Sequence, residues 1–339
     1  MSATIYRGQR GSYQTDDPRP IAYGRVSVLL AGADEDGKKV ALKVFREAPE
    51  LKMEFAREIA AQQAMNHPNI LPVLDYGENA GPNAAPFLVM PFCEGGSLRQ
   101  LMQGRDFLAP AAALNILDQI ALAVDYAHQN GLVHGDIKPE NILFPQQAMH
   151  ACLSDFGAAK YFPVIGKIST ATAAEHRGTM TYLSPEEIQF ARQSPASDIY
   201  AFAVVAYEMF TGKYPFKIDA PLYQLLTAKV EGKVIDPVEF NHHLPAAVKQ
   251  ALLAGLRVDP KQRPASARDF CRMLREEMKP SAAAVAPENA EAEPAPGKSR
   301  GFWPSLSATQ KVAIISALIT AAVAIVTAVI NIIPELVKK

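Results

Sequence analysis

Short apolar runs separated by polar turns dominate the first 90 residues of the chain. Residues 26–30 (Val-Ser-Val-Leu-Leu) and 40–44 (Val-Ala-Leu-Lys-Val) flank the polar stretch 34–37, and this arrangement predicts a β-hairpin. Residues 54–65 instead place apolar side chains at helical spacing, and residues 87–90 form a further short apolar strand. The pattern therefore predicts a small, mostly β unit that contains one helix.

The pattern becomes helical beyond Gly95 and Gly96. From Pro110 onward, apolar residues recur at steps of three and four, which is typical of a helix with one buried face. Residues 197–211 and 245–256 predict two more helices. We therefore expect a second, larger unit that is mainly α-helical.

The C-terminal part differs from both units. Residues 280–301 are rich in Pro, Ala and Glu and cannot offset the entropy of an ordered backbone, so they predict a flexible linker. Residues 312–333 contain no charge over 22 residues. As a helix they would be roughly 33 Å long, against a hydrocarbon core of roughly 30 Å. We predict a transmembrane helix followed by a short tail, 334–339; the alternative is a buried core helix, which would normally have a polar face.

Small residues recur at every fourth position of the predicted span, at Ser316, Thr320, Ala324 and Ala328. Such a stripe lets two helices approach closely in lipid, and it predicts a homodimer through the transmembrane helix. An alanine-rich helix also shows this spacing by composition alone. Both interpretations remain open.

Charge and cysteine content narrow the function classes. The chain has 34 basic and 35 acidic residues and a net charge of −1, so we expect no nucleic-acid partner. Three widely separated cysteines fit a reducing compartment. The polar N-terminal segment 1–19 lacks the apolar run of a secretory signal. Lys298, Arg300 and Lys311 agree with a cytoplasmic N-terminal side, although Lys338 and Lys339 oppose it.

Residues 134–141, His-Gly-Asp-Ile-Lys-Pro-Glu-Asn, carry the strongest chemical signal, and Asp155-Phe156-Gly157 begins 19 residues after Asp136. Asp136 could accept or orient the proton of an attacking hydroxyl, and Lys138 could neutralise charge on a transferring phosphoryl group. Asn141 and Asp155 offer the oxygen ligands that Mg²⁺ prefers. The spacing predicts phosphoryl transfer from Mg-ATP.

These motifs resemble the set found in eukaryotic-like serine/threonine protein kinases, over residues 20–278. The resemblance implies an α+β bilobal kinase fold over 20–279, with a β-rich N-lobe of about 20–90 and an α-helical C-lobe of about 94–279. The matching residues are Lys43, Glu58, His134, Asp136, Lys138, Asn141, Asp155, Gly157, Thr179, Ser184, Pro185, Glu186, Asp198 and Arg263.

The resemblance also implies the role of each residue. Lys43 and Glu58 would hold the phosphates of ATP, and Asp136 and Lys138 would complete the catalytic set. The residues implied to contact the nucleotide are Gly24, Val28, Ala41, Lys43, Met90, Phe92 and Cys93, with Met90 as gatekeeper. The residues implied to support the site are His134, Thr179, Glu186, Asp198 and Arg263, with Glu186 paired to Arg263. Lys138 and Thr179 favour Ser/Thr over Tyr as the acceptor.

The chain departs from the family pattern at two positions. Aligning the glycine-rich loop with residues 21–28 leaves all three signature glycines substituted, with Gly24 in a different slot. Gly135 replaces the arginine that pairs with a phosphorylated activation loop, so we expect no dependence on that switch. Candidate phosphorylation sites in the activation segment are Ser169, Thr170 and Thr172.

Together, these features predict a signalling transferase: a Ser/Thr protein kinase that uses ATP and Mg²⁺, with Mn²⁺ as an alternative, on protein substrates. We expect a single-pass protein of the inner or plasma membrane with a cytoplasmic kinase domain. The alternative is a membrane-anchored pseudokinase or nucleotide-binding scaffold, which the glycine-poor loop favours and the intact transfer residues oppose.

Overall fold

The computed structural model describes residues 4–17, 19–24, 27–46, 55–56, 59–60, 65–78, 85–146, 149–156 and 180–276. These residues lie in one compact unit, Met1–Ala282. The predicted linker, span and tail lie outside the described residues, as do Glu58, Gly157, Thr179 and the three candidate phosphorylation sites. Within the described ranges, no helix combines the length and apolar character needed to cross a bilayer.

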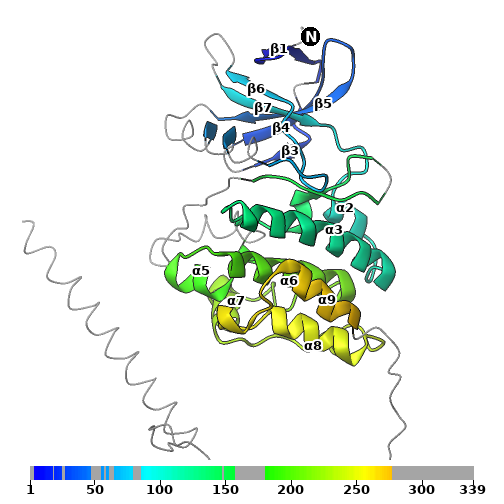
Figure 1. Ribbon diagram of the computed structural model, residues 1–339, viewed down its shortest axis with the longest axis vertical. Helices are drawn as coiled ribbons and strands as arrows, with labels where there is room; N and C mark the ends of the chain where they lie inside the picture. The colour runs from blue at the N-terminus through cyan, green and yellow to red at the C-terminus, as the bar shows by residue number, and fades with distance from the viewer. Residues whose placement is uncertain are drawn as a thin grey trace, which may run out of the picture. The chain divides into compact units, whose positions relative to one another are not determined.

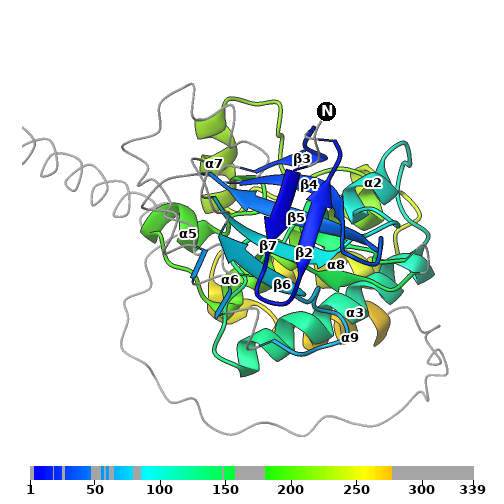
Figure 2. The ribbon, with the colours of Figure 1, turned by 90° about the horizontal axis from the view of Figure 1, so that it is seen from above.

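The N-lobe is an antiparallel sheet, seen from the side in Figure 1 and from above in Figure 2. Its order is β1-β2-β4-β5-β7-β6, and β3 also pairs with β4. The predicted hairpin is present as β4 and β5, and the predicted strand at 87–90 lies within β7. The strands are β1 (Thr4–Arg7), β2 (Ser12–Thr15), β3 (Ala22–Tyr23), β4 (Ser27–Ala33), β5 (Lys39–Phe45), β6 (Asp75–Glu78) and β7 (Pro86–Pro91).

The two faces of this sheet have different partners, because successive side chains on a strand point to opposite sides. One face carries Leu30, Leu42 and Phe87 and is covered by Tyr6 and Tyr13 of the N-terminal strands. The other face carries Leu88 and Phe45, which pack against the helical residues Phe55 and Ile59, and Met90, which packs against Leu71. Alternation thus directs every second residue of β5 toward the second lobe.

The N-terminal segment 1–19, predicted only as a polar stretch, contains the β1–β2 hairpin. Its two buried tyrosines supply apolar area, and the ring of Tyr6 meets Phe87 edge-on at 5.2 Å. The buried carboxylate of Asp75 accepts hydrogen bonds from Gln9 N at 3.0 Å, Arg10 N at 2.9 Å and the Tyr13 hydroxyl at 3.0 Å. The hairpin is therefore bound to the sheet by both apolar packing and a buried acceptor.

The C-lobe is mainly α-helical, as predicted, and the predicted helices at 197–211 and 245–256 are present. Prolines begin several helices at the first position, where the missing N–H removes no helical bond. The helices are α2 (Leu98–Met102), α3 (Pro110–Gln129), α5 (Pro185–Phe190), α6 (Pro195–Thr211), α7 (Leu222–Val230), α8 (Ala246–Gly255) and α9 (Ala267–Glu276), with the short strands β8 (Ile142–Leu143) and β9 (Cys152–Leu153).

Helix α6 is the central element of the C-lobe. Every residue from Ser197 to Thr211 is buried, and α6 packs against α3, α8 and α9 (Figure 1). A helix that is apolar on all sides belongs inside a domain. Two carboxylates, Asp198 and Glu208, are nevertheless buried near its ends. Buried carboxylates are retained only with hydrogen-bonding partners, so these two positions mark polar contacts of importance.

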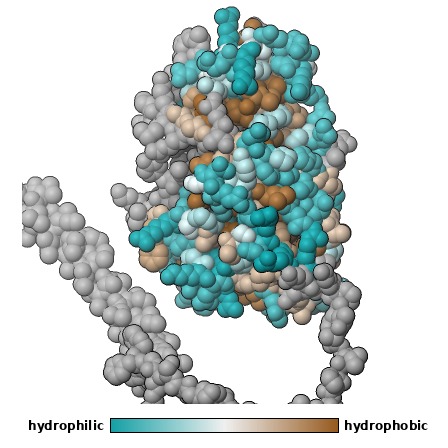
Figure 3. Space-filling view, in the orientation of Figure 1, coloured by the Kyte–Doolittle hydropathy of each residue, from teal (hydrophilic) through white to brown (hydrophobic). Residues whose placement is uncertain are grey.

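Hydrophilic residues cover most of the face drawn in Figure 3. On the face drawn in Figure 3, hydrophobic residues form small, separate patches between polar ones. Among the large apolar side chains that remain exposed are Tyr23, Phe190 and Tyr223. Apolar side chains scattered singly are normal on a protein surface.

We expect Asp75→Ala to lower the free energy of unfolding by roughly 3 kcal/mol, because the donors of Gln9, Arg10 and Tyr13 lose a buried charged acceptor. Urea unfolding of the 339-residue chain measures the change. The control is Asp36→Ala in the exposed β4–β5 turn, which should change stability by less than about 0.5 kcal/mol. Equal effects of the two substitutions would contradict a stabilising role for Asp75.

Candidate active site

An ion pair joins the two lobes. Lys43 on β5 places its Nζ atom 2.6 Å from Oδ1 of Asp155, which follows β9. Burial alone would raise the pKa of Asp155, but the charge and hydrogen bond of Lys43, aided by the charge of Lys138, outweigh burial and hold that pKa below its usual value. The Asp155 carboxylate is therefore ionised at neutral pH.

Asp155 has an unusual backbone. Its φ of +66° lies in the left-handed region, which is uncommon for a residue with a side chain. The preceding Ser154 is fixed by two hydrogen bonds to Asn141 O, from its N–H at 2.9 Å and its hydroxyl at 3.0 Å. Such conformations persist where the surroundings enforce them, and they concentrate at functional sites. The geometry directs this carboxylate toward Lys43.

The catalytic loop, residues 134–141, brings three predicted residues together. Lys138 Nζ lies 2.9 Å from Oδ2 of Asp136, and Asn141 Nδ2 donates to Asp136 O at 2.8 Å and to its Oδ2 at 3.1 Å. Because the Asn141 amide nitrogen serves Asp136, its oxygen is the atom that can act as a metal ligand. One short loop thus presents a carboxylate, an ammonium group and an amide oxygen.

His134 supports this loop from the inside. The Asp136 N–H donates to His134 Nδ1 at 3.1 Å, and His134 Nε2 lies 2.9 Å from Ser154 O. A ring that accepts at Nδ1 and donates at Nε2 is the neutral form. Burial lowers the pKa of His134 despite nearby carboxylates, which agrees with neutrality. The imidazole therefore connects the catalytic loop to the chain that leads into Asp155.

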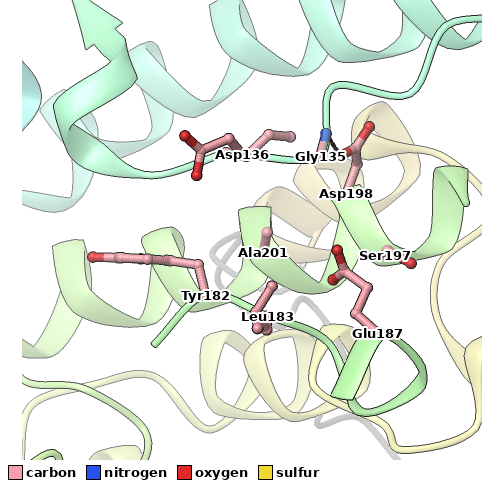
Figure 4. A pocket seen from close by; sticks show the side chains of 9 residues that line it. Gly135, Asp136, Tyr182, Leu183, Glu187, Ser197, Asp198 and Ala201 are labelled. Atoms are coloured by element: carbon pink, nitrogen blue, oxygen red, sulfur yellow. Dashed lines mark hydrogen bonds between the residues drawn. The ribbon is translucent and has the colours of Figure 1, made fainter. Parts of the chain in front are cut away.

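The side chain of Asp198 on α6 binds the backbone of the same loop. Its carboxylate accepts from His134 N and Gly135 N, both at 2.8 Å, and pairs with His128 Nε2 at 2.7 Å. Figure 4 shows the Asp198 side chain beside Gly135. Sequence reasoning assigned Asp198 this position but missed His128, which is distant in sequence and carries no local motif.

Gly135 lies in a left-handed conformation, with φ of +71°. A Cβ atom there would lie 2.6 Å from Nε2 of Gln193. Gln193 donates to Gly135 O at 3.5 Å and to Glu187 Oε1 at 3.3 Å. The space beside position 135 is therefore occupied by a neutral amide.

The predicted pair Glu186–Arg263 is bidentate, with distances of 2.8 Å and 2.7 Å. Burial would raise the pKa of Glu186, but the Arg263 hydrogen bonds and charge lower it. Arg263 also donates to three backbone carbonyls, those of Ala196, Arg257 and Val258. The pair fixes the start of α5 against the C-lobe core.

The sheet register shows on which face two residues of β4 lie. Leu29 lies opposite Lys43, whereas Val28 lies opposite Val44. Residues directly opposite each other share a face of the sheet. Val28 therefore packs in the outer core with Leu30, and Leu29 is on the face of Lys43. Val28, predicted as a nucleotide contact, therefore lies on the opposite face of the sheet from Lys43.

Gly24 lies between β3 and β4, and its expected place outside the three signature glycine positions stays a prediction. Gly24 N–H donates to Ser27 O at 2.8 Å and closes the turn between β3 and β4. A Cβ on Gly24 would lie 3.1 Å from that oxygen. A glycine suits this close approach.

An apolar cluster lies beside the ion pair on the inner face of the sheet. Its members are Leu71, Met90 and Cys152, with Leu29, Val73, Cys93 and Leu143 packed against them. Ala41 shares this face, because it lies opposite Met90. Phe92 differs in that its ring lies under the exposed Lys39, 5.9 Å from Nζ. Burial raises the pKa of Cys93 to about 12, so its thiol is neutral.

A second polar network borders the catalytic loop and was not foreseen. Arg99 on α2 donates to Glu140 Oε1 at 2.8 Å and to the Tyr182 hydroxyl at 2.6 Å, and it also pairs with Glu208 of α6. The Tyr182 hydroxyl donates to Glu208 at 2.7 Å. These partners are between 26 and 109 positions apart, so no local pattern signals them.

Figure 4 shows how the chain after position 180 meets the catalytic loop. Gly135 and Asp136 lie on one side of a small cavity, and Tyr182 and Leu183 lie on the other. The cavity has a volume of about 10 Å³, close to the minimum that holds one water molecule. The two segments are therefore near neighbours.

Residues 20–274 match the protein kinase domain family. The chain belongs to this family. It is 30% identical over 251 residues to the serine/threonine-protein kinase PrkC of Bacillus subtilis, which covers 73% of this chain and 38% of that protein. It is 33% identical over 232 residues to the serine/threonine-protein kinase PknB of Mycobacterium tuberculosis, which covers 67% of this chain and 36% of that protein. The match thus spans little more than a third of the full length of each of these relatives.

The fold also matches a solved structure. A crystal structure of Rad53 residues 1–466 in complex with AMP-PNP aligns with a TM-score of 0.64 and 22% identity, over 80% of this chain and 65% of that one. At this identity the match supports the fold. The protein kinase fold predicted from the motifs is therefore confirmed.

We expect Gly135→Ala to lower the free energy of unfolding by roughly 1–2 kcal/mol, because a side chain is strained at a positive φ. Gly11→Ala is the control: its φ is not positive, and a Cβ there would lie 3.8 Å from its nearest neighbour. Urea unfolding compares the two variants. A loss no larger at Gly135 than at Gly11 would contradict the argument from strain.

Proposed function

We propose that this protein is a serine/threonine protein kinase that transfers the γ-phosphoryl group of Mg-ATP to hydroxyl groups of proteins. The observation that carries the proposal is the meeting of two groups in one site: the Lys43–Asp155 pair from the two lobes, and Asp136 with Lys138 and Asn141 on one loop. Membership of the protein kinase family and relatives named serine/threonine-protein kinases support it.

The residues divide the chemistry between them. Asp136 orients the acceptor hydroxyl and takes its proton, and Lys138, at 2.9 Å from Asp136, stabilises negative charge that develops on the phosphoryl group. Lys43 binds phosphate oxygens, and the apolar cluster around Met90 holds the adenine ring. Glu58 and Thr179 complete this assignment by the family pattern.

Asn141 and Asp155 fit a magnesium site by the chemistry of their donors. Asp155 offers an ionised carboxylate and Asn141 an amide oxygen. Mg²⁺ typically takes one or two carboxylates from the protein and its remaining ligands from phosphate and water. When bound, the ion neutralises charge on the phosphates of ATP.

A nucleotide-binding scaffold was the alternative, and it rested on the glycine-poor loop. The meeting of Lys43 with Asp155 and of Asp136 with Lys138 and Asn141 opposes it. The site is also held in one geometry. His134 is neutral, Asp198 binds three partners, and Asp155 has a positive φ. Preorganisation of this kind serves transfer chemistry.

We further propose that residues 312–333 anchor the kinase domain to the cell membrane as a single span, with the catalytic part cytoplasmic. The basis is the charge-free stretch of 22 residues. Its stripe of small residues supports a homodimer, which would raise the effective concentration of two kinase domains.

We expect Asp136→Asn and Lys43→Met each to lower the rate of phosphorylation of a generic Ser/Thr acceptor by a factor on the order of 10²–10⁴, because each removes a group that acts in the transfer step. Lys39→Met is the matched control, since Lys39 begins the same strand and its side chain is 70% exposed. The measurement is incorporation of labelled phosphate from ATP and Mg²⁺.

Three outcomes are informative. A normal rate in the Lys39 variant beside near-complete loss in the other two supports the proposal. Equal rates in the wild type and both active-site variants would show that the phosphate comes from elsewhere and reject it. Nucleotide binding without transfer by the wild type would favour the scaffold.

Deletion of residues 312–333 should move the protein from the membrane pellet to the supernatant after cell fractionation, because the charge-free stretch supplies the apolar length needed to span a bilayer. Thr320→Leu is the control, since it keeps the apolar length while changing the small-residue stripe. Retention of the deletion variant in the pellet after a carbonate wash would refute the proposed anchor.

A further inference from the structure

Helix α7 buries a lysine completely. The side chain of Lys229 is 0% exposed, although long charged side chains are almost never fully buried without a charged partner. Its ammonium group donates to the backbone carbonyl of Thr181. The rings of Tyr200 and Phe216 lie at 5.1 Å and 5.0 Å from Nζ. The ammonium is therefore enclosed by one carbonyl and two aromatic faces.

This arrangement is costly for folding. Burial lowers the pKa of Lys229 to about 7, and the charge of Glu187 only partly opposes the effect. The adjoining Tyr200 hydroxyl is buried and makes no hydrogen bond within the described ranges. Apolar residues of similar volume are often as stable as buried charges, or more so. A lysine at this position therefore needs a reason other than stability.

The carbonyl that Lys229 binds belongs to the acceptor-side segment, residues 180–184. This segment is fixed further along by the Tyr182 hydroxyl, which donates to Glu208, and by Ser184, whose N–H donates to Glu187 at 2.8 Å. Met180 and Leu183 also pack against apolar side chains of α7. Lys229 supplies a polar anchor at Thr181, the second residue of the segment.

The segment lies beside the catalytic loop and is not part of the apolar cluster around Met90. Tyr182 and Leu183 share the small cavity of Figure 4 with Asp136. Lys43 and the apolar cluster around Met90 come instead from the sheet and from β8 and β9. Two substrates must reach Asp136 from different sides, and the phosphates occupy the side of Lys43. The acceptor therefore approaches from the side of residues 180–184.

We propose that Lys229 is a positioning residue for the protein acceptor. Through its hydrogen bond to Thr181, it holds residues 180–184 in the position that lets an acceptor hydroxyl reach Asp136. The inference rests on the proposed kinase function and deepens it. It assigns a role in acceptor binding to a residue of α7 that itself lies outside the reacting groups.

The experiment compares the wild type with Lys229→Met in the 339-residue chain, because methionine fills a similar volume without a hydrogen-bond donor. Lys233→Met is the matched control, as Lys233 follows α7, is 71% exposed and pairs with Glu231. The probes are ATP with Mg²⁺ and dephosphorylated casein as the acceptor. We expect Lys229→Met to raise KM for casein about fivefold or more and to leave KM for ATP within about twofold. The reason is that residues 180–184, which lose their anchor, contact only the acceptor.

Thermal unfolding gives a second readout, and its sign follows from linkage. The pKa of Lys229 is lowered on folding, so the unfolded chain binds the extra proton between pH 7 and the ordinary lysine value. The penalty is full below pH 7 and is relieved as the pH rises. Glu187 of α5, Tyr200 of α6 and Phe216 of the α6–α7 connection face the ammonium. The Tm of the Met variant minus that of the wild type should therefore be larger at pH 6 than at pH 9.

The outcomes distinguish a failure of the positioning role of Lys229 from a failure of the proposed kinase function. A selective rise in KM for casein in a variant that is not less stable at pH 6 supports the positioning role. An unchanged KM for casein in an active variant overturns it. A rise in KM for both casein and ATP together with a lower Tm also overturns it, because it would indicate a purely structural lysine. A wild type that transfers no phosphate overturns the proposed function, and the acceptor role of Lys229 with it.

Discussion

The catalytic loop depends on one buried carboxylate. Asp198 accepts hydrogen bonds from two consecutive backbone amides of the loop, at His134 and Gly135, and also binds His128. This carboxylate can stay in the core because these donors satisfy it, and it projects from a helix whose residues 197–211 are all buried. The positions of Asp136, Lys138 and Asn141 then follow, since all three lie within six residues of Gly135.

The second constraint is the register between β4 and β5. A strand has a side-chain period of two, so a shift by one residue would turn Lys43 away from Asp155 and into the outer core. The outer core prevents this shift, because Leu30, Leu42 and Phe87 must stay under Tyr6 and Tyr13. Apolar packing on one face of the sheet thus fixes an ion pair on the other.

Much of the site could be predicted from the sequence because its groups are close along the chain. Asp136, Lys138 and Asn141 share one loop, and the resemblance to protein kinases identified Lys43. Val28 was chosen by its position in a motif, and a motif does not determine which residues pair across a sheet. The β1–β2 hairpin was missed because its strands bury few side chains and its main polar partner, Asp75, is more than 60 positions away.

That hairpin has a practical consequence for the boundaries of the kinase domain. The family match begins at residue 20, whereas Tyr6 and Tyr13 lie before it. A chain cut at the family boundary would uncover Val40, Leu42 and Phe87, each of which is at most 1% exposed in the intact fold. It would also remove three of the donors to the buried carboxylate of Asp75. A contiguous apolar surface of this kind promotes aggregation, so the folding unit of this protein is longer than the family definition suggests.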